Sequence, residues 1–265
     1  MVHGSSGDRE TKLVATIKRT DAEKSLPRHH YPKTDPVRSA CYLCGTTDNP
    51  TKEHVFSRNL FKPNDIEHPV ILTACTTCNA HKEGIEDYVF TYMIWTTERP
   101  EAEQQRKRFS EAYKARQPKI LMPGQQETPK GNKLFQSIIT GMKDIPIYSQ
   151  EGIYLGSGGE VKIDPVKFTD FYVNICKGLY TSASDEIHDW SKYDVYSQYD
   201  SITYGTHWSK DLFMFAVNNA QFHEAWDSHL IFSGFIYTMK DGKRASMWSL
   251  ALYNEQLAYV MLKEK

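Results

Sequence analysis

The sequence has few cysteines and lacks any long apolar run. With only five cysteines among 265 residues, four of them in a metal-type spacing described below, a disulfide framework is not expected. No run of about eighteen apolar residues occurs, so we expect no membrane-spanning helix and no membrane partner. Residues 1–7 lack the apolar core of a signal peptide. Together these absences favour a cytoplasmic protein.

A strong net charge is also absent. The formal charge of −1 argues against a protein that binds nucleic acid through a uniformly basic surface. The charges are nevertheless unevenly distributed, because residues 1–40 and 96–130 are each net basic whereas residues 41–95 are net acidic. Two basic segments can neutralise phosphates on either side of a central site. A solvated surface explains the same pattern about as well.

Four of the five cysteines form two C-x-x-C pairs about thirty residues apart. Within each pair the two-residue spacer lets both thiolates turn onto one ion, and four thiolates in a tetrahedral arrangement are the usual structural site for zinc. We therefore predict that a structural zinc ion is held by Cys41, Cys44, Cys75 and Cys78. Polar residues that a bare zinc knuckle does not need lie between and directly after the pairs.

We expect strands at residues 53–56 and 70–72, followed by a helix that begins near the second cysteine pair. Asn79 and Lys82 would share one face of this helix, three residues apart. The first strand opens with a glutamate and a histidine. Because neighbouring strand residues point to opposite faces, a bulge or a twist would be needed to bring both to one ion.

The series C-x-x-C, Glu-His-Val and C-x-x-C-Asn-x-x-Lys resembles the HNH (ββα-metal) endonuclease motif in its zinc-stabilised form, over about a fifth of the chain. The resemblance implies a second divalent ion, Mg²⁺ or a transition ion, bound by Glu53 and Asn79. It implies that His54 is the general base that activates the attacking water, which suits an imidazole whose pKa lies near neutrality. Lys82 would contact a flanking phosphate.

The sequence departs from that motif at one position. The family's middle asparagine, which orients the general base, usually precedes the third cysteine by a few residues, where this chain has Glu67-His68-Pro69-Val70. Asn59, Asn64, His68 or the backbone would then orient the histidine, and otherwise the site is weakened or inactive. His81 is a rival of Asn79 as an ion ligand.

Each of the other motif residues also has a purely structural interpretation. His54 fits a buried hydrogen-bonding residue, and Asn79 fits a cap at the start of a helix. Lys82 fits a solvated charge on a helix surface.

We predict an α+β fold, in which a small zinc-bound ββα-metal module is followed by a mixed α+β domain with an antiparallel C-terminal sheet. Proline and glycine residues between 118 and 131 suggest a linker. The predicted segments are a flexible basic arm (1–36), the zinc module (37–95), a charged helix and linker (96–130) and the α+β domain (131–265).

Several elements are expected in the C-terminal domain. Gly156–Gly159 indicates a hairpin turn, and Asp164-Pro165 indicates the start of a helix that Gly178 ends. Cys176 lies on the apolar stripe of that helix, so we interpret it as a small buried hydrophobic residue. Strands are predicted at 230–239, 246–253 and 258–262, with Asp241-Gly242 in the first turn.

Taken together, the sequence predicts a metal-dependent endonuclease that hydrolyses nucleic-acid phosphodiester bonds, with DNA as the expected substrate. The C-terminal domain would supply target choice or regulation, or form a homodimer. A non-catalytic zinc module that binds nucleic acid or a protein partner is the alternative. The missing asparagine and the near-neutral charge favour that alternative.

Overall fold

The structure is a computed structural model of the chain. It describes residues 39–57, 70–96, 107, 143–149, 151–160, 163–201, 207–226, 230–252 and 256–265. The predicted basic arm and, apart from Lys107, the predicted charged helix and linker between 97 and 130 lie outside these residues. Within the described part of the chain, no helix is both long and apolar enough to cross a membrane.

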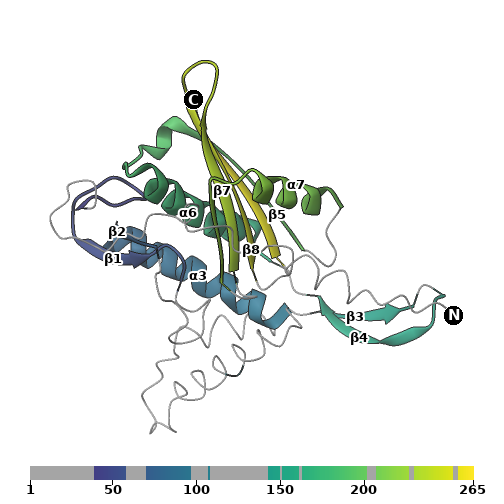
Figure 1. The fold of residues 1–265 in the computed structure, drawn as a ribbon. Helices are drawn as coiled ribbons and strands as arrows, with labels where there is room; N and C mark the ends of the chain where they lie inside the picture. The colour runs from purple at the N-terminus through teal and green to yellow at the C-terminus, as the bar shows by residue number, and fades with distance from the viewer. Residues whose placement is uncertain are drawn as a thin grey trace, which may run out of the picture. The chain divides into compact units, whose positions relative to one another are not determined.

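The described elements confirm an α+β fold (Figure 1). A turn, a hairpin and a long helix carry the four clustered cysteines, and an antiparallel sheet follows towards the C-terminus. In chain order the elements are β1 (Pro50–His54), β2 (Ile71–Cys75), α3 (Thr76–Thr96), β3 (Lys143–Tyr148), β4 (Tyr154–Glu160), α6 (Pro165–Ser184), the short 3₁₀ helix η3 (Trp190–Lys192), β5 (Tyr193–Ser201), α7 (His207–Asn218), β6 (Phe222–Trp226), β7 (Leu230–Thr238), β8 (Arg244–Leu252) and β9 (Gln256–Glu264).

The chain forms two compact units. The first unit contains residues 1–83 and 169–265, and the second unit contains residues 84–168. The cysteines, the β1–β2 hairpin and the C-terminal sheet all belong to the first unit. The sequence-based segment boundaries remain predictions.

The β1–β2 hairpin is short and regular. Its strands pair antiparallel without a register shift, from Pro50 opposite Cys75 to His54 opposite Ile71. The bulge or twist that would bring Glu53 and His54 to one face is therefore not present between these strands. Regular alternation places the two side chains on opposite faces of the hairpin.

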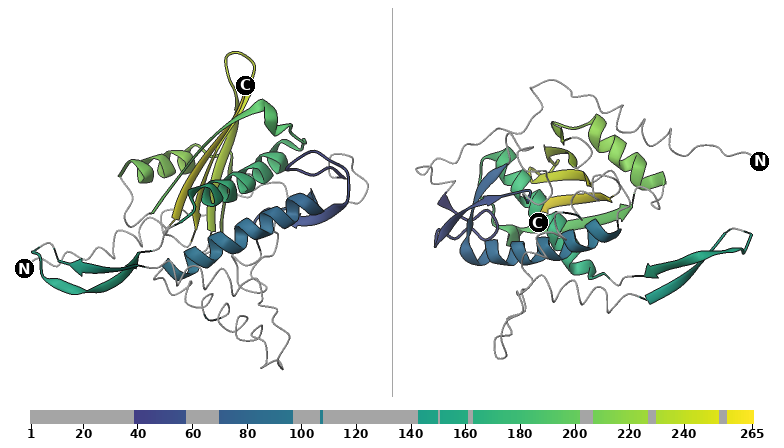
Figure 2. Two further views of the ribbon diagram at one scale, coloured as in Figure 1. Left: turned by 180° about the vertical axis from the view of Figure 1, so that it is seen from behind. Right: turned by 90° about the horizontal axis from the view of Figure 1, so that it is seen from below.

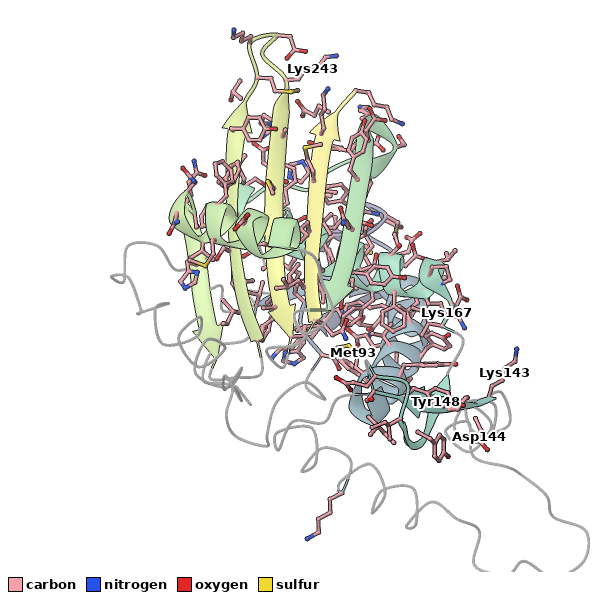
Figure 3. All side chains as sticks on the ribbon, turned by 90° about the vertical axis from the view of Figure 1, so that its right-hand side faces the viewer. Met93, Lys143, Asp144, Tyr148, Lys167 and Lys243 are labelled. Carbon is pink, nitrogen blue, oxygen red and sulfur yellow. The ribbon has the colours of Figure 1, made fainter. Side chains whose placement is uncertain are left out.

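The C-terminal sheet has five antiparallel strands in the order β5-β9-β8-β7-β6 (Figures 1 and 2). The strands predicted at 230–239, 246–253 and 258–262 are its three central strands. The Asp241-Gly242 turn is confirmed, with Gly242 at φ +82° and Lys243 near the tip of the hairpin (Figure 3). The outer strands β5 and β6 were not predicted.

The sheet buries apolar side chains on both faces. On one face the core residues Ile231, Ala251, Leu257 and Tyr259 pack with Met214 and Val217 of α7. On the other face Phe232 stacks against Phe56, which follows β1, with ring centroids 5.3 Å apart. Because side chains alternate along a strand, one face of the sheet packs against α7 and the opposite face packs against the segment that follows β1.

The helix predicted to begin at Asp164-Pro165 is confirmed as α6, but its predicted end at Gly178 is wrong. The Asp164 carboxylate accepts a hydrogen bond from the Val166 amide at 3.0 Å, as an N-cap does. The helix continues to Ser184. Gly178 is there for packing, since a Cβ atom at this position would lie 2.6 Å from Cγ2 of Val55.

The hairpin predicted at Gly156–Gly159 is also wrong. These glycines lie inside β4, which pairs with β3 from Lys143 opposite Glu160 to Tyr148 opposite Tyr154. Before β4, the Ser149 amide donates to the Ile153 carbonyl at 2.8 Å and Gly152 adopts φ +82°, which are features of a turn. Glycine runs suggest turns, but here they form part of a two-stranded ribbon.

Candidate metal centre and the residues around it

The first cysteine pair lies in a tight turn. The Gly45 amide donates to the Cys41 carbonyl at 2.7 Å, and the Cys41 amide donates to the Thr46 carbonyl at the same distance. Gly45 has φ +78°, a conformation that favours glycine. This turn brings the side chains of Cys41 and Cys44 to one side.

The second pair spans the junction between a strand and a helix. Cys75 is the last residue of β2, and Cys78 lies in the first turn of α3. The Cys78 amide donates to the Cys75 sulfur at 3.4 Å. Amides at a helix N-terminus favour negative charge, so this junction suits a thiolate ligand.

The four sulfur atoms of Cys41, Cys44, Cys75 and Cys78 converge. All of them lie within 4.8 Å of one another, and those of Cys44 and Cys75 are 3.7 Å apart. A tetrahedral zinc ion with Zn–S bonds of about 2.3 Å requires sulfurs about 3.8 Å apart. The cluster is therefore positioned to hold a structural zinc ion, as the sequence predicts.

The pKa values of these thiols indicate that a cation is needed for all four to ionise. Burial and neighbouring thiols raise the pKa of Cys44 and of Cys78 above the ordinary value. Burial acts to raise the pKa of Cys75, but hydrogen bonds with the other three cysteines, those with Cys78 first, outweigh burial and lower that pKa. Four adjacent thiolates repel one another, and a divalent cation is what allows all four to ionise together.

Among the described residues, this is the one place where three or more histidine, cysteine or acidic side chains converge closely enough to bind a metal. Beside it, β1 and α3 are joined by polar contacts that involve the residues predicted to act in catalysis.

Glu53 pairs with Lys82. The Lys82 ammonium lies 2.6 Å from Oε1 of Glu53 and donates to the His54 carbonyl at 2.9 Å. The Lys82 side chain is 2% exposed and that of Glu53 is 12% exposed. This buried ion pair fixes the end of β1 against α3.

Asn79 makes a second connection one helical turn earlier. Its Nδ2 donates to Oγ1 of Thr51 at 3.3 Å, and that hydroxyl donates to the Ala74 carbonyl at 2.9 Å. Thr51 and Glu53 are two residues apart in β1 and so face the same side. Because α3 begins at Thr76, Asn79 lies within the first turn and not at the cap position.

The side chain of His54, unlike its carbonyl, takes part in neither of these two connections. Its side chain is half-buried with a buried Nδ1 atom, and strand alternation directs it away from the face that carries Glu53. Asn59, Asn64 and His68, the candidates to orient its ring, lie outside the described residues. The hairpin thus brings Glu53, Asn79 and Lys82 together on the face towards α3 and leaves His54 on the other. His81, the rival ligand, is exposed.

Sequence reasoning missed the residues that connect the zinc turn to the rest of the first unit. The Trp190 indole donates to the Tyr42 carbonyl at 2.6 Å, and the Tyr42 amide donates to the Thr73 carbonyl at 2.9 Å. The bond between Trp190 and Tyr42 joins residues 148 positions apart, and its acceptor is a backbone carbonyl. No local sequence motif therefore indicates it. Cys176 is fully buried in α6, as predicted.

Comparisons of the chain with protein-family models, curated proteins and solved structures gave no match. The zinc-binding cluster beside a β-hairpin and a helix is therefore the firm part of the resemblance.

Proposed function

We propose that the protein is a metal-dependent nuclease that cuts nucleic-acid phosphodiester bonds, with DNA as the expected substrate. One observation carries the proposal: a cluster of four cysteines positioned to hold zinc lies where a β-hairpin meets a helix, and Glu53 and Asn79 share the face between the hairpin and the helix. A zinc clamp alone does not require an acid and an amide at these positions.

The residues on that face fit a divalent cation. Lys82 engages Oε1 of Glu53, which leaves Oε2 as the oxygen able to bind an ion, and the Asn79 amide uses its nitrogen towards Thr51. Carboxylate and amide oxygens are the donors that Mg²⁺ prefers. When bound, such an ion stabilises the negative charge of the phosphate and of the leaving oxygen.

His54 supplies the base in this proposal. A neutral imidazole accepts a proton from water near pH 7, because its ordinary pKa is close to 6.5. Lys82 is assigned a positioning role, since its ammonium is buried and binds both the Glu53 carboxylate and the His54 carbonyl.

Two observations favour a second candidate, a zinc module that binds nucleic acid or a protein partner without catalysis. The Glu53 carboxylate is already neutralised by Lys82, and the regular register directs His54 away from it. A carboxylate in a buried ion pair is a weaker ligand for an added cation than one exposed to solvent.

Cleavage assays separate the two candidates. The zinc-loaded chain is incubated with supercoiled plasmid, single-stranded DNA and RNA in Mg²⁺, Mn²⁺ or Ni²⁺, beside His54→Ala and Asn79→Ala. The matched control is Lys52→Ala, which removes an exposed side chain from the same strand.

The nuclease proposal predicts cleavage by the wild type and by Lys52→Ala, with a loss of at least about a hundredfold in His54→Ala, the usual effect of removing a general base. Absence of cleavage with every metal, in a chain that retains zinc, would reject the nuclease. Retarded migration of a nucleic acid in a gel without cleavage would then support the binding module.

A further inference from the structure

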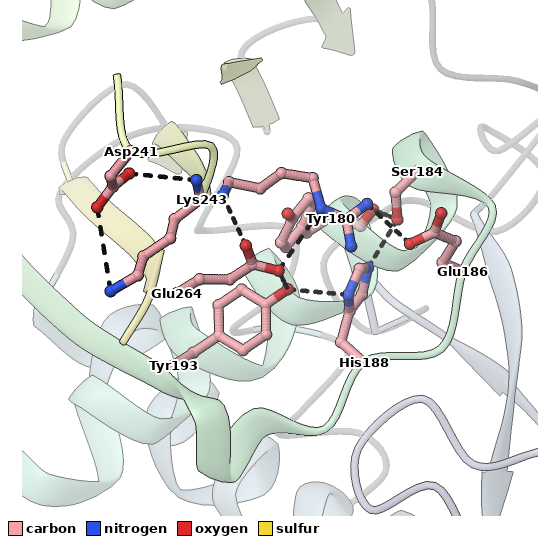
Figure 4. A network of polar contacts seen from close by, with 9 residues as sticks. Tyr180, Ser184, Glu186, His188, Tyr193, Asp241, Lys243 and Glu264 are labelled. Atoms are coloured by element: carbon pink, nitrogen blue, oxygen red, sulfur yellow. Dashed lines mark hydrogen bonds and ion pairs between the residues drawn. The ribbon is translucent and has the colours of Figure 1, made fainter. Parts of the chain in front are cut away.

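A second polar cluster lies far along the chain from the cysteines, where α6 ends and meets the sheet (Figure 4). At its centre is His188, which is 5% exposed. Its Nε2 lies 2.7 Å from Oγ of Ser184, and its Nδ1 lies 3.1 Å from the Tyr193 hydroxyl. Its ring stacks on Tyr180 with centroids 4.4 Å apart and planes 11° from parallel.

The hydroxyl protons of this cluster determine the state of the ring. Ser184 has one hydroxyl proton, which it donates to the Tyr180 carbonyl at 2.8 Å. Tyr193 has one, which it donates to Oε1 of Glu264 at 3.0 Å. Both hydroxyls must then accept from His188, so both ring nitrogens must carry a proton. The complete set of four hydrogen bonds is that of an imidazolium.

Charged groups from several elements surround the ring. Arg244 of β8 pairs with Glu186, after α6, at 2.8 Å, and its amide donates to Glu264 of β9 at 2.6 Å. Burial and Arg244 lower the pKa of His188, whereas Glu186 and Glu264 oppose that effect. The phenols of Tyr180 and Tyr193 remain neutral, because burial raises the pKa of both. With a protonated ring the cluster contains two cations and two carboxylates.

We propose that His188 is a proton-operated latch between the end of α6 and strands β5 and β9. With two protons the ring donates to Ser184 and to Tyr193 at once. After losing one proton, a neutral ring has one donor and one acceptor, and one of the four hydrogen bonds is given up. The latch is therefore complete where the ring carries both protons and incomplete at higher pH.

Trp190 contacts both His188 and the zinc turn, and so connects the two. The rings of His188 and Trp190 lie 5.2 Å apart, and the Trp190 indole donates to the Tyr42 carbonyl between Cys41 and Cys44. Lys177 lies over the Trp190 ring, 5.5 Å from its centroid. A change in the hydrogen bonds of His188 is therefore expected to reach the tilted ring of Trp190, which contacts the zinc turn.

The test is NMR of the full zinc-loaded chain with ¹⁵N-labelled histidine and tryptophan. Signals are assigned with His188→Gln and Trp190→Phe. We expect the second ring nitrogen of His188 to gain its proton as the pH falls, with a midpoint below the ordinary histidine value of about 6.5, because burial and Arg244 lower the pKa of this ring. The Trp190 indole proton should shift with the same midpoint. Zinc content is measured at each pH, because protonation of cysteine also releases metal.

Substitutions of the surrounding charged residues should shift the titration midpoint of His188 in opposite directions. Glu264→Gln removes a carboxylate that favours the charged ring, so the His188 midpoint should fall. Arg244→Met removes an opposing cation, so the midpoint should rise. Tyr193→Phe removes an acceptor and should lower the midpoint. His188→Gln should abolish the indole shift while thermal unfolding shows a folded chain.

Three results would overturn the latch. One is a His188 ring that keeps a single protonation state through the pH range in which the chain is folded. Another is an indole signal that titrates unchanged in His188→Gln. The third is an equal shift of the midpoint in Glu264→Gln and Arg244→Met.

Discussion

At the scale of single residues, Lys82 shows how a side chain that sequence patterns place on a helix surface can instead be buried. Its ammonium is covered because it binds Glu53 and the His54 carbonyl together. From the sequence alone, a lysine at this position of the helix fits a solvated surface as well as it fits a buried ion pair. Only the packing of β1 against α3 shows that Lys82 is buried.

Breaking this ion pair should destabilise the fold. Lys82→Met leaves the Glu53 carboxylate buried without its cation, and we expect a loss of roughly 3 kcal/mol in the free energy of unfolding. The double variant Lys82→Met/Glu53→Gln removes both charges and should recover most of that loss. Urea unfolding of the zinc-loaded chain measures both values.

A loss below about 1 kcal/mol in Lys82→Met would show that the pair is worth no more than a surface salt bridge. Recovery of stability in the double variant without recovery of cleavage would separate the structural role of Glu53 from its proposed role as an ion ligand.

At the scale of elements, α6 depends on a close approach that only glycine permits. Gly178 lies against Val55, where a Cβ atom would be 2.6 Å from one methyl group and 2.7 Å from the other. The helix continues past this position because the glycine serves packing and does not end the helix. Helix-forming residues on both sides give no signal of this difference.

Gly178→Ala should therefore destabilise the chain by roughly 1–3 kcal/mol, the usual cost of overpacking. The control is Gly84→Ala in α3, where a Cβ atom meets nothing within 4 Å and a gain of about 0.5–1 kcal/mol is expected from helix propensity. Thermal unfolding compares the two. Equal effects of both substitutions would contradict the packing role of Gly178.

Other elements show where sequence reasoning succeeds and fails. The central strands were predicted because apolar runs end at a clear Asp241-Gly242 turn. Strand β5 was missed because its tyrosines, serines and aspartates read as a polar segment, although it pairs with β9 along its whole length. Gly156–Gly159 misled for the opposite reason, since a turn-like run lies within a strand.

At the scale of the whole molecule, the zinc cluster and the C-terminal sheet belong to one compact unit. Trp190 donates a hydrogen bond to the Tyr42 carbonyl, Gly178 packs against Val55, and Phe232 stacks on Phe56. The spacing of the cysteines predicted the cluster of four sulfurs that is positioned to hold a zinc ion. None of these three contacts was predictable, because each joins residues far apart in sequence through shape and not through a motif.

Removing zinc should accordingly weaken the sheet as well as the hairpin. We expect Cys75→Ser to lose zinc and to unfold at a lower temperature, with the helical and strand signals lost together. Circular dichroism and metal analysis measure this. Cys176→Ala, a substitution of a buried cysteine outside the cluster, is the control and should retain zinc. A Cys75→Ser chain with full helicity and no metal would contradict the structural assignment.

The bond between Trp190 and Tyr42 has a consequence for how the chain is made. Its two residues are 148 positions apart, whereas the sulfurs of Cys44 and Cys75 are separated by 31. Contacts between nearby positions form sooner than contacts between distant ones. We therefore expect the four sulfurs to come together early in folding, whereas Trp190 can reach the Tyr42 carbonyl only after most of the remaining chain has been synthesised.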